Sequence, residues 1–281
     1  MVAILLSLLS AAAYGTSDFV GGIAASRLPP WTVSMLSNLV GGLACVAVAL
    51  ASAGAVTGPD LAWAGLAAVG NVVGTTFLYR GMNAGRMGVV APVSGVCAAL
   101  VPAIVGVAGG ERPGLAALVG VVLALPGIWL VSTGSPPEDS EVRSGVGAGV
   151  ADGLVAGTGF GVLFVALAQA SEGSGLWPVA VNQLIAAALV VGLASALRVT
   201  WRPRRDGSVT AGVAGLLGTA ATAAFLVATR HGYLTVTSVI SALYPAATVL
   251  LAAVVLRERI GRGQAAGLVL CATAVAFVAA A

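Results

Sequence analysis

Long apolar runs of about 20 residues follow one another along almost the whole chain, separated by short stretches rich in Gly, Pro and charge. We place them at 2–25, 31–53, 61–79, 89–108, 115–133, 146–170, 177–197, 209–229, 236–256 and 264–280. About 20 apolar residues are needed for a helix to cross the hydrocarbon core of a bilayer. Ten such helices and their loops use nearly all of the 281 residues. The sequence therefore predicts an all-α, polytopic membrane protein with no sizeable soluble domain.

The charge content supports the bilayer as the main solvent. Only 8% of the residues are charged, whereas soluble domains carry roughly 25%. The net charge of +3 comes from arginines scattered over short loops, so no basic patch of the kind that nucleic acid requires is formed. Cys45, Cys97 and Cys271 lie in apolar runs without metal-ligand spacing. We expect no nucleic-acid partner, metal, cofactor or catalytic residue, and hence no enzyme.

The most polar stretch of the chain falls at its midpoint and predicts a linker. Residues 134–143 read Gly-Ser-Pro-Pro-Glu-Asp-Ser-Glu-Val-Arg, which combines turn formers with charge. We divide the chain into a first five-helix unit at 1–133, a linker at 134–144 and a second five-helix unit at 145–281.

The two units repeat one another. A shift of 147 residues places Glu111-Arg112 on Glu258-Arg259, and with them Ser94 on Ser241 and Gly120 on Gly267. Because five is an odd number, the second unit must enter the membrane from the opposite side. The prediction is ten transmembrane helices arranged as two inverted five-helix repeats, which in transporters place the solute site near the midplane between the repeats.

The arginines indicate an orientation. Counting alternate loops puts eleven of them on one side of the membrane, and only Arg112 and Arg230 on the other. The positive-inside rule would place the eleven in the cytoplasm and both termini outside.

The repeated Glu-Arg-x-Gly turn after a proline-bearing helix resembles the EamA-type members of the drug/metabolite transporter superfamily. The matching positions are Tyr14-Gly15, Tyr244-Pro245, Glu258-Arg259 and Gly267. The first half departs from the pattern, because Ala98 stands where the shift places Pro245. The resemblance implies a central cavity lined by the first four helices of each half, with the fifth and tenth helices peripheral. It also implies cytoplasmic termini, in conflict with the arginine count, and both orientations stay open.

Asp18 is the strongest candidate for a functional residue. It interrupts the first apolar run, where a carboxylate costs at least about 2.5 kcal/mol. Helical spacing places it on one face with Tyr14 and other small or polar residues. We interpret it as a binding group for a proton, a cation or an ammonium, the alternative being a role in packing alone. Asp152, in the opening turns of the sixth run, is a second candidate for proton coupling, or else a helix-start carboxylate favoured by the dipole.

Uncharged polar residues and prolines form the remaining candidates. The substrate-binding set is Tyr14, Asp18, Asn38, Asn71, Ser94, Asn182, Gln183, Ser241, Tyr244 and Pro245. The amides could equally join helices, and the prolines could serve packing alone. Arg80 and Arg230 end corresponding helices and are expected to extend to lipid headgroups. Glu111-Arg112 and its repeat are interpreted as turn structure that holds a gate region.

These features favour a secondary transporter in the cell membrane. We expect it to export a small metabolite, an amino acid or an amphipathic drug-like solute by alternating access, with proton coupling through Asp18 as an option. Its expected partners are that solute and the lipid bilayer, and a homodimer is left open. A sensor or helper subunit, or an enzyme acting on a lipid-linked substrate, are the alternatives.

Overall fold

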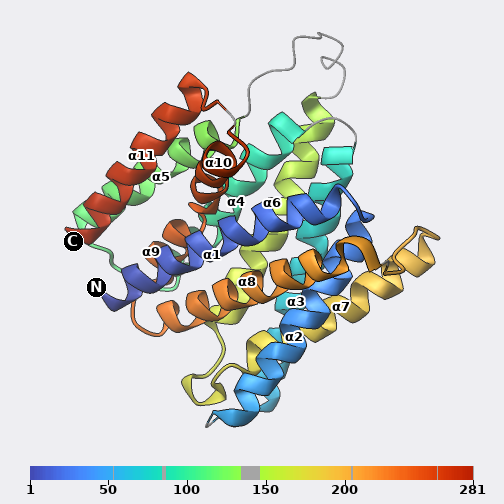
Figure 1. Ribbon diagram of the computed structural model, residues 1–281. Coiled ribbons are helices and arrows are strands. Elements are labelled where there is room, and N and C mark those ends of the chain that lie inside the picture. Colours follow the sequence, from blue (N-terminus) through green and yellow to red (C-terminus); the bar gives the residue numbers. More distant parts are fainter. Residues whose placement is uncertain (53, 84–86, 134–145, 204, 258, 281) are drawn as a thin grey trace.

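The computed structural model describes residues 1–52, 54–83, 87–133, 146–203, 205–257 and 259–280, so the expected linker at 134–144 lies outside the described residues. The helices and their order are visible in Figure 1. They are α1 (Val2–Ala25), α2 (Pro30–Ala51), α3 (Gly58–Asn83), α4 (Met87–Ala108), α5 (Leu115–Ser132), α6 (Val146–Ala168), the short 3₁₀ helix η2 (Glu172–Ser174), α7 (Trp177–Ala196), α8 (Arg205–Thr229), α9 (Leu234–Ser241), α10 (Tyr244–Val255) and α11 (Arg262–Ala279).

Ten segments of the described chain are long and apolar enough to cross a membrane, which confirms the predicted fold class. The ninth segment differs from the expected continuous helix. It is divided into α9 and α10 by a turn at Ala242 and Leu243. Pro245 lies in the first turn of α10, where its missing N–H leaves no hydrogen bond unmade and its ring cannot clash with a preceding turn. The corresponding helix of the first half, α4, contains Pro92 and Pro102 and is continuous.

The two halves interlock through their first helices. α1 packs mainly on α8 and on α10, both from the second half, and α6 packs in the same way on α3 and α4 of the first half. The two closing helices, α5 and α11, pair with each other and lie together at one edge in Figure 1. Each half therefore completes its packing only against the other.

Small residues allow the interlocked helices to approach closely. A Cβ atom built on Gly15 of α1 would lie 2.6 Å from the Tyr244 carbonyl oxygen and 2.9 Å from the Thr248 nitrogen of α10. Ser10 and Ser17, also on α1, donate hydrogen bonds to backbone carbonyls of α8 at 2.9 and 2.8 Å. Such small-residue contacts and interhelical hydrogen bonds are the usual means of joining helices in lipid.

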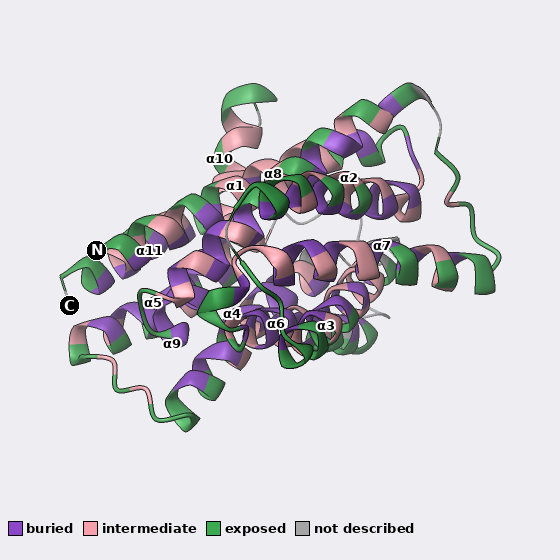
Figure 2. Cartoon of the chain, turned by 90° about the horizontal axis from the view of Figure 1, so that it is seen from below, coloured by how far each residue is buried: buried purple, intermediate pink, exposed green. Residues whose placement is uncertain are grey.

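Exposed residues lie on the outer faces of the helices (Figure 2), and many of them are large and apolar. On α1 the outer stripe includes Leu5, Leu9 and Ile23, with 60%, 57% and 37% of their surface accessible. In contrast, all eight residues of α9 are buried. The stripe on α1 defines the face that meets lipid and, by difference, the face that meets the protein interior.

Both chain ends lie on the same face of the bundle, as expected for an even number of spans (Figure 1). We call this the termini face. The loops that join α2 to α3, α4 to α5, α6 to α7 and α8 to α9 lie on the same face. The other loops lie on what we call the opposite face.

Candidate functional site

Asp18 lies on the inner face of α1, and its side chain is exposed there. The helical period places it beside Tyr14 and Gly15 and turned well away from the lipid-facing Leu9 and Ile23. One turn further along the same face, a Cβ atom built on Gly22 would meet no atom within 4 Å. The accessible carboxylate thus borders open space on the interior side of the helix, in the half of α1 that leads to the opposite face.

Asp18 has no hydrogen-bond donor or ion-pair partner within the part of the chain that the structure describes. The cost of holding a carboxylate within a membrane span is therefore not offset by a protein partner. A group that arrives from solution, whether water, a proton or a cation, can fill that role.

Aromatic side chains cluster around Tyr14, one helical turn from Asp18. The ring of Tyr14, one turn away on α1, lies 6.1 Å from the rings of both Phe164 on α6 and Tyr244 on α10. The Tyr14 hydroxyl is hydrogen-bonded to the Thr222 hydroxyl of α8 at 2.7 Å. Phe164 in turn packs on Phe225 with 4.5 Å between ring centroids. Four helices from both repeats thereby contribute to one aromatic cluster.

The break between α9 and α10 brings Tyr244 and Pro245 into this group. At the break, α10 begins against α1, where Thr248 donates a hydrogen bond to the Gly15 carbonyl oxygen at 3.1 Å. Tyr244 and Pro245 are half-buried. We define the α1 site as Tyr14, Asp18, Phe164, Tyr244 and Pro245.

A carboxylate beside aromatic rings suits a positively charged solute with an apolar body. The carboxylate supplies the counter-charge, and the aromatic faces attract a cation and cover apolar surface. The same carboxylate can instead hold a proton when it is away from water. The α1 site can perform either chemistry.

The predicted amides lie outside the α1 site, and most have partners. The side-chain amide of Asn71 donates to the side-chain oxygen Oδ1 of Asn38 at 3.2 Å, joining α3 to α2. The Gln183 amide donates to the Thr219 hydroxyl at 2.7 Å, joining α7 to α8. These are equivalent contacts in the two halves, and in this conformation they hold helices together.

Two other predicted residues are buried without partners among the described residues. Neither amide atom of Asn182, which is 1% exposed, makes a hydrogen bond, and neither does the hydroxyl of Ser241, the last residue of α9. Unsatisfied buried polar groups are costly. Asn182 and Ser241 remain predictions as site residues.

Ser94 and Asp152 lie at the contacts that α6 makes with α3 and α4. The Ser94 hydroxyl donates to the Ala91 carbonyl oxygen within α4, at 3.1 Å, and a Cβ atom on Gly157 of α6 would lie 2.5 Å from the Ser94 carbonyl oxygen. Asp152 is buried and accepts a hydrogen bond from Arg80 Nε at 2.9 Å. Arg80, which the sequence predicted to extend to lipid headgroups, is bound by this buried carboxylate.

Phe164 is the member of the α1 site that sequence reasoning missed. The repeat that aligns Tyr14-Gly15 with Phe160-Gly161 also aligns Asp18 with Phe164. That register could have identified it, but an apolar residue in an apolar helix gives no signal of its own. The two repeats therefore differ at this position, with a carboxylate in one and an aromatic ring in the other.

A polar cluster closes the loops on the termini face. Asp60 accepts hydrogen bonds from the backbone N–H and the hydroxyl of Ser171, at 2.8 and 3.0 Å, which joins the two repeats. Arg230 donates to the carbonyl oxygens of Ser171 and Gly175, at 3.2 and 2.9 Å. Burial lowers the pKa of the Arg230 guanidinium, while the nearby Glu172 and Asp60 act to raise it. Like Arg80, Arg230 is therefore held by contacts within the protein.

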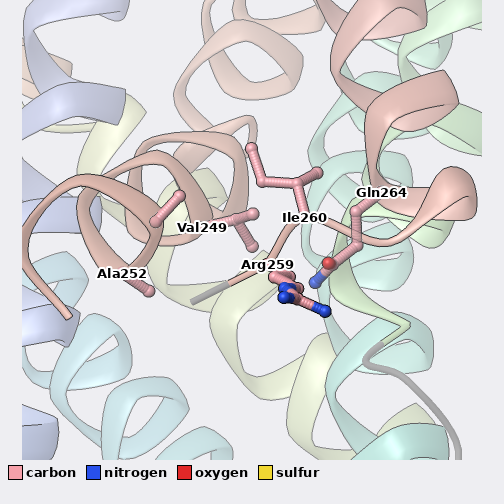
Figure 3. Close-up of a pocket in the computed structure, with 6 residues that line it drawn as sticks. Val249, Ala252, Arg259, Ile260 and Gln264 are labelled. Atoms are coloured by element: carbon pink, nitrogen blue, oxygen red, sulfur yellow. The ribbon is translucent and has the colours of Figure 1, made fainter. Parts of the chain in front are cut away.

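Two surface pockets contain none of the α1-site residues. One, shown in Figure 3, lies between α10 and the start of α11 and is lined by Val249, Ala252, Ala253, Arg259, Ile260 and Gln264. The other is an apolar hollow between α4 and α5 that also touches Thr235 of α9. Neither contains a carboxylate, so the α1 site remains the candidate for solute binding.

Comparisons with known proteins agree with this architecture. The sequence profile of the EamA-like transporter family matches residues 1–133 and again residues 147–280. No curated protein matches the chain. A solved structure described only as the crystal structure of a protein superposes with a TM-score of 0.75 at 18% sequence identity, covering 99% of this chain and 98% of its own. At that identity the likeness concerns the fold alone.

Proposed function

Because the chain belongs to the EamA-like transporter family, we propose that it is a secondary transporter that carries a small amine-bearing solute through the α1 site. The observation that supports this most directly is the unpartnered, accessible Asp18 beside Tyr14 and Tyr244. The carboxylate holds the ammonium of the solute, the rings cover its apolar part, and a proton occupies Asp18 on the return step. We place the protein in the cell membrane and its transport in the direction of export.

Flux in proteoliposomes tests the proposal. The purified protein is exposed to monovalent amines with apolar bodies and to matched neutral analogues, under an imposed pH gradient. We expect gradient-dependent flux of amines only. Asp18→Asn should lower that flux at least about tenfold, since a charge-assisted contact is lost. Asp206→Asn, a change at an exposed carboxylate at the start of α8, should leave it unchanged.

Each alternative outcome has a distinct meaning. Unchanged, gradient-dependent flux in the Asp18→Asn variant would contradict the role of Asp18 in both binding and coupling. Binding of amines to the purified protein without any flux would instead identify a sensor or helper subunit. Flux of neutral analogues alone would remove the amine from the proposal.

A further inference from the structure

Glu111, in the loop between α4 and α5, binds the start of a helix that belongs to the other repeat. Its carboxylate oxygens accept hydrogen bonds from the backbone N–H groups of Leu234 and Thr235, at 2.6 and 2.8 Å. The Thr235 hydroxyl donates a third, at 2.6 Å. Leu234 and Thr235 are the first two residues of α9. A first-repeat carboxylate thus satisfies the free N–H groups at the positive end of a second-repeat helix.

The backbone of α4 passes so close to this contact that residue 106 has no room for a side chain. A Cβ atom built on Gly106 of α4 would overlap the Glu111 carboxylate and lie 2.6 Å from the Thr235 hydroxyl oxygen. Glycine at position 106 therefore lets the loop carboxylate reach α9 past α4. Charge-assisted hydrogen bonds of this kind are roughly twice as strong as neutral ones.

α9 connects this contact to the α1 site. All eight of its residues are buried, from Leu234 at the termini face to Ser241. The turn at Ala242 and Leu243 follows, and then Tyr244 of the α1 site. A helix of this length spans about 12 Å. Because α9 is short and buried along its whole length, a movement at one end shifts the other end as well.

The two faces of the bundle differ in a way that assigns the contact a role. Polar contacts join the two repeats near both faces, through Glu111 and Asp60 on the termini face and through the Arg27–Asp206 and Arg80–Asp152 ion pairs toward the opposite face. The packing differs, because all eight residues of α9 on the termini side are buried, whereas α10, which continues toward the opposite face, has no buried residue. Toward the opposite face, the inner side of α1 at Gly22 borders open space. The termini face is therefore the closed one in this structure, and Glu111 is the residue that fixes the broken helix to it.

We propose that Glu111 is a positioning residue that holds α9 in the conformation closed at the termini face and releases it when the path opens there. This inference rests on the proposed transport function, because it assigns Glu111 to one of the two states of an alternating-access cycle. Glu111 acts on the solute site through α9 and Tyr244 and does not contact the solute.

Two single-cysteine reporters test the proposal without any solute. Cys45, Cys97 and Cys271 are first replaced by alanine, and Ser238→Cys or Gly22→Cys is then introduced. Ser238 is fully buried on α9, the helix whose first turn is held by Glu111, whereas a side chain at Gly22 meets open space. The rate of reaction with a water-soluble thiol reagent is measured for each reporter, with and without Glu111→Gln.

We expect Glu111→Gln to raise the reaction rate of the Ser238→Cys reporter about tenfold and to lower that of the Gly22→Cys reporter, since one charge-assisted contact is weakened. Glu172→Gln, at an exposed carboxylate of another loop on the termini face, should change neither. Glu111→Asp, which keeps the charge, should restore part of the original rates.

The opposite results would overturn the proposal. Unchanged rates at both reporters would show that Glu111 does not hold the closed state. Rates that rise together at both reporters, with a lower melting temperature, would show that it only stabilises the fold. If Glu111→Gln raises the rate at one reporter and lowers it at the other, but the protein carries no solute in proteoliposomes, the proposed function is refuted. The role of Glu111 in holding α9 is then still supported.

Discussion

Asp18 and Asp152 each lie inside an apolar helix, and their surroundings separate their roles. Asp152 is buried and paired with Arg80, so the protein already provides its counter-charge. Asp18 is accessible and has no partner among the described residues. Of the two predicted proton-coupling candidates, Asp18 is therefore the one whose charge is available to a solute or a proton.

The Arg80–Asp152 pair should contribute measurably to stability. Arg80→Ala leaves the buried Asp152 carboxylate without its main donor, and we expect a loss of about 1.5–3 kcal/mol in the free energy of unfolding. Arg27→Ala removes a pair whose side chains are 56% and 81% exposed and should cost about 0–1 kcal/mol. Thermal unfolding of the two variants in the same detergent compares them. Equal losses would contradict a structural role for the buried pair.

Two glycines on the same helix offer a matched pair of substitutions. Gly15→Ala places a methyl group 2.6 Å from the Tyr244 carbonyl oxygen, so α1 and α10 must separate. Such overpacking costs about 1–3 kcal/mol. Gly22→Ala meets open space and should leave stability unchanged or slightly improved. Melting temperatures measure both, and a destabilised Gly22→Ala variant would show that the inner face of α1 is filled there.

Much of the α1 site could be predicted from residue type and spacing, and the rest depended on contacts between helices. A carboxylate in an apolar run identified Asp18, and the helical period placed Tyr14 beside it. The pairing of Asn38 with Asn71 and of Gln183 with Thr219 could not be foreseen, because the sequence of one helix does not give its rotation toward the next.

Among the helices, the ninth span was predicted from the sequence, but its division into α9 and α10 was not. Length and hydropathy predicted a membrane-spanning segment, and Tyr244-Pro245 marked it as a candidate for bending. Proline permits either a kink within a helix or a new helix start. The choice is made by packing, since α9 is held at its first turn by Glu111 while α10 begins against Gly15.

Removing the proline should favour a continuous ninth helix. Pro245→Ala restores an N–H, and alanine stabilises a helix interior by about 3 kcal/mol relative to proline. Ala98, the equivalent residue of the continuous α4, shows that alanine fits such a helix. We expect a melting temperature that is unchanged or higher, with a maximal flux several-fold lower. Flux equal to that of the unaltered protein would show that the break is not needed for transport.

For the whole molecule, the number of spans in each repeat predicted the architecture well. Five spans per half require opposite insertion, and the structure accommodates the two halves by packing α1 on α8 and α6 on α3. The sequence could not show that the halves would differ in conformation. Only the structure reveals the broken α9–α10 segment facing a continuous α4, an asymmetry expected of a protein that opens to one face at a time.

The even number of spans places both ends of the chain on one face of the membrane. Short epitope tags fused at residues 1 and 281 should become accessible to antibody under the same conditions, either in intact cells or only after permeabilisation. The arginine distribution and the family resemblance favour different faces, and this experiment also decides between them. Tags that become accessible under different conditions would contradict ten spans.

We propose that the inner face of α1 around Asp18 belongs to a path that opens alternately to the two faces of the membrane. The direct measurement is the labelling of a Gly22→Cys variant, in the cysteine-free background, by an impermeant thiol reagent applied to right-side-out and to inside-out vesicles. We predict labelling from both sides, with rates that shift in opposite directions when a transported amine is added. The lipid-facing Ile23→Cys variant should react slowly from either side. Labelling of the Gly22→Cys variant from neither side, or from one side only whatever solute is present, would contradict the account.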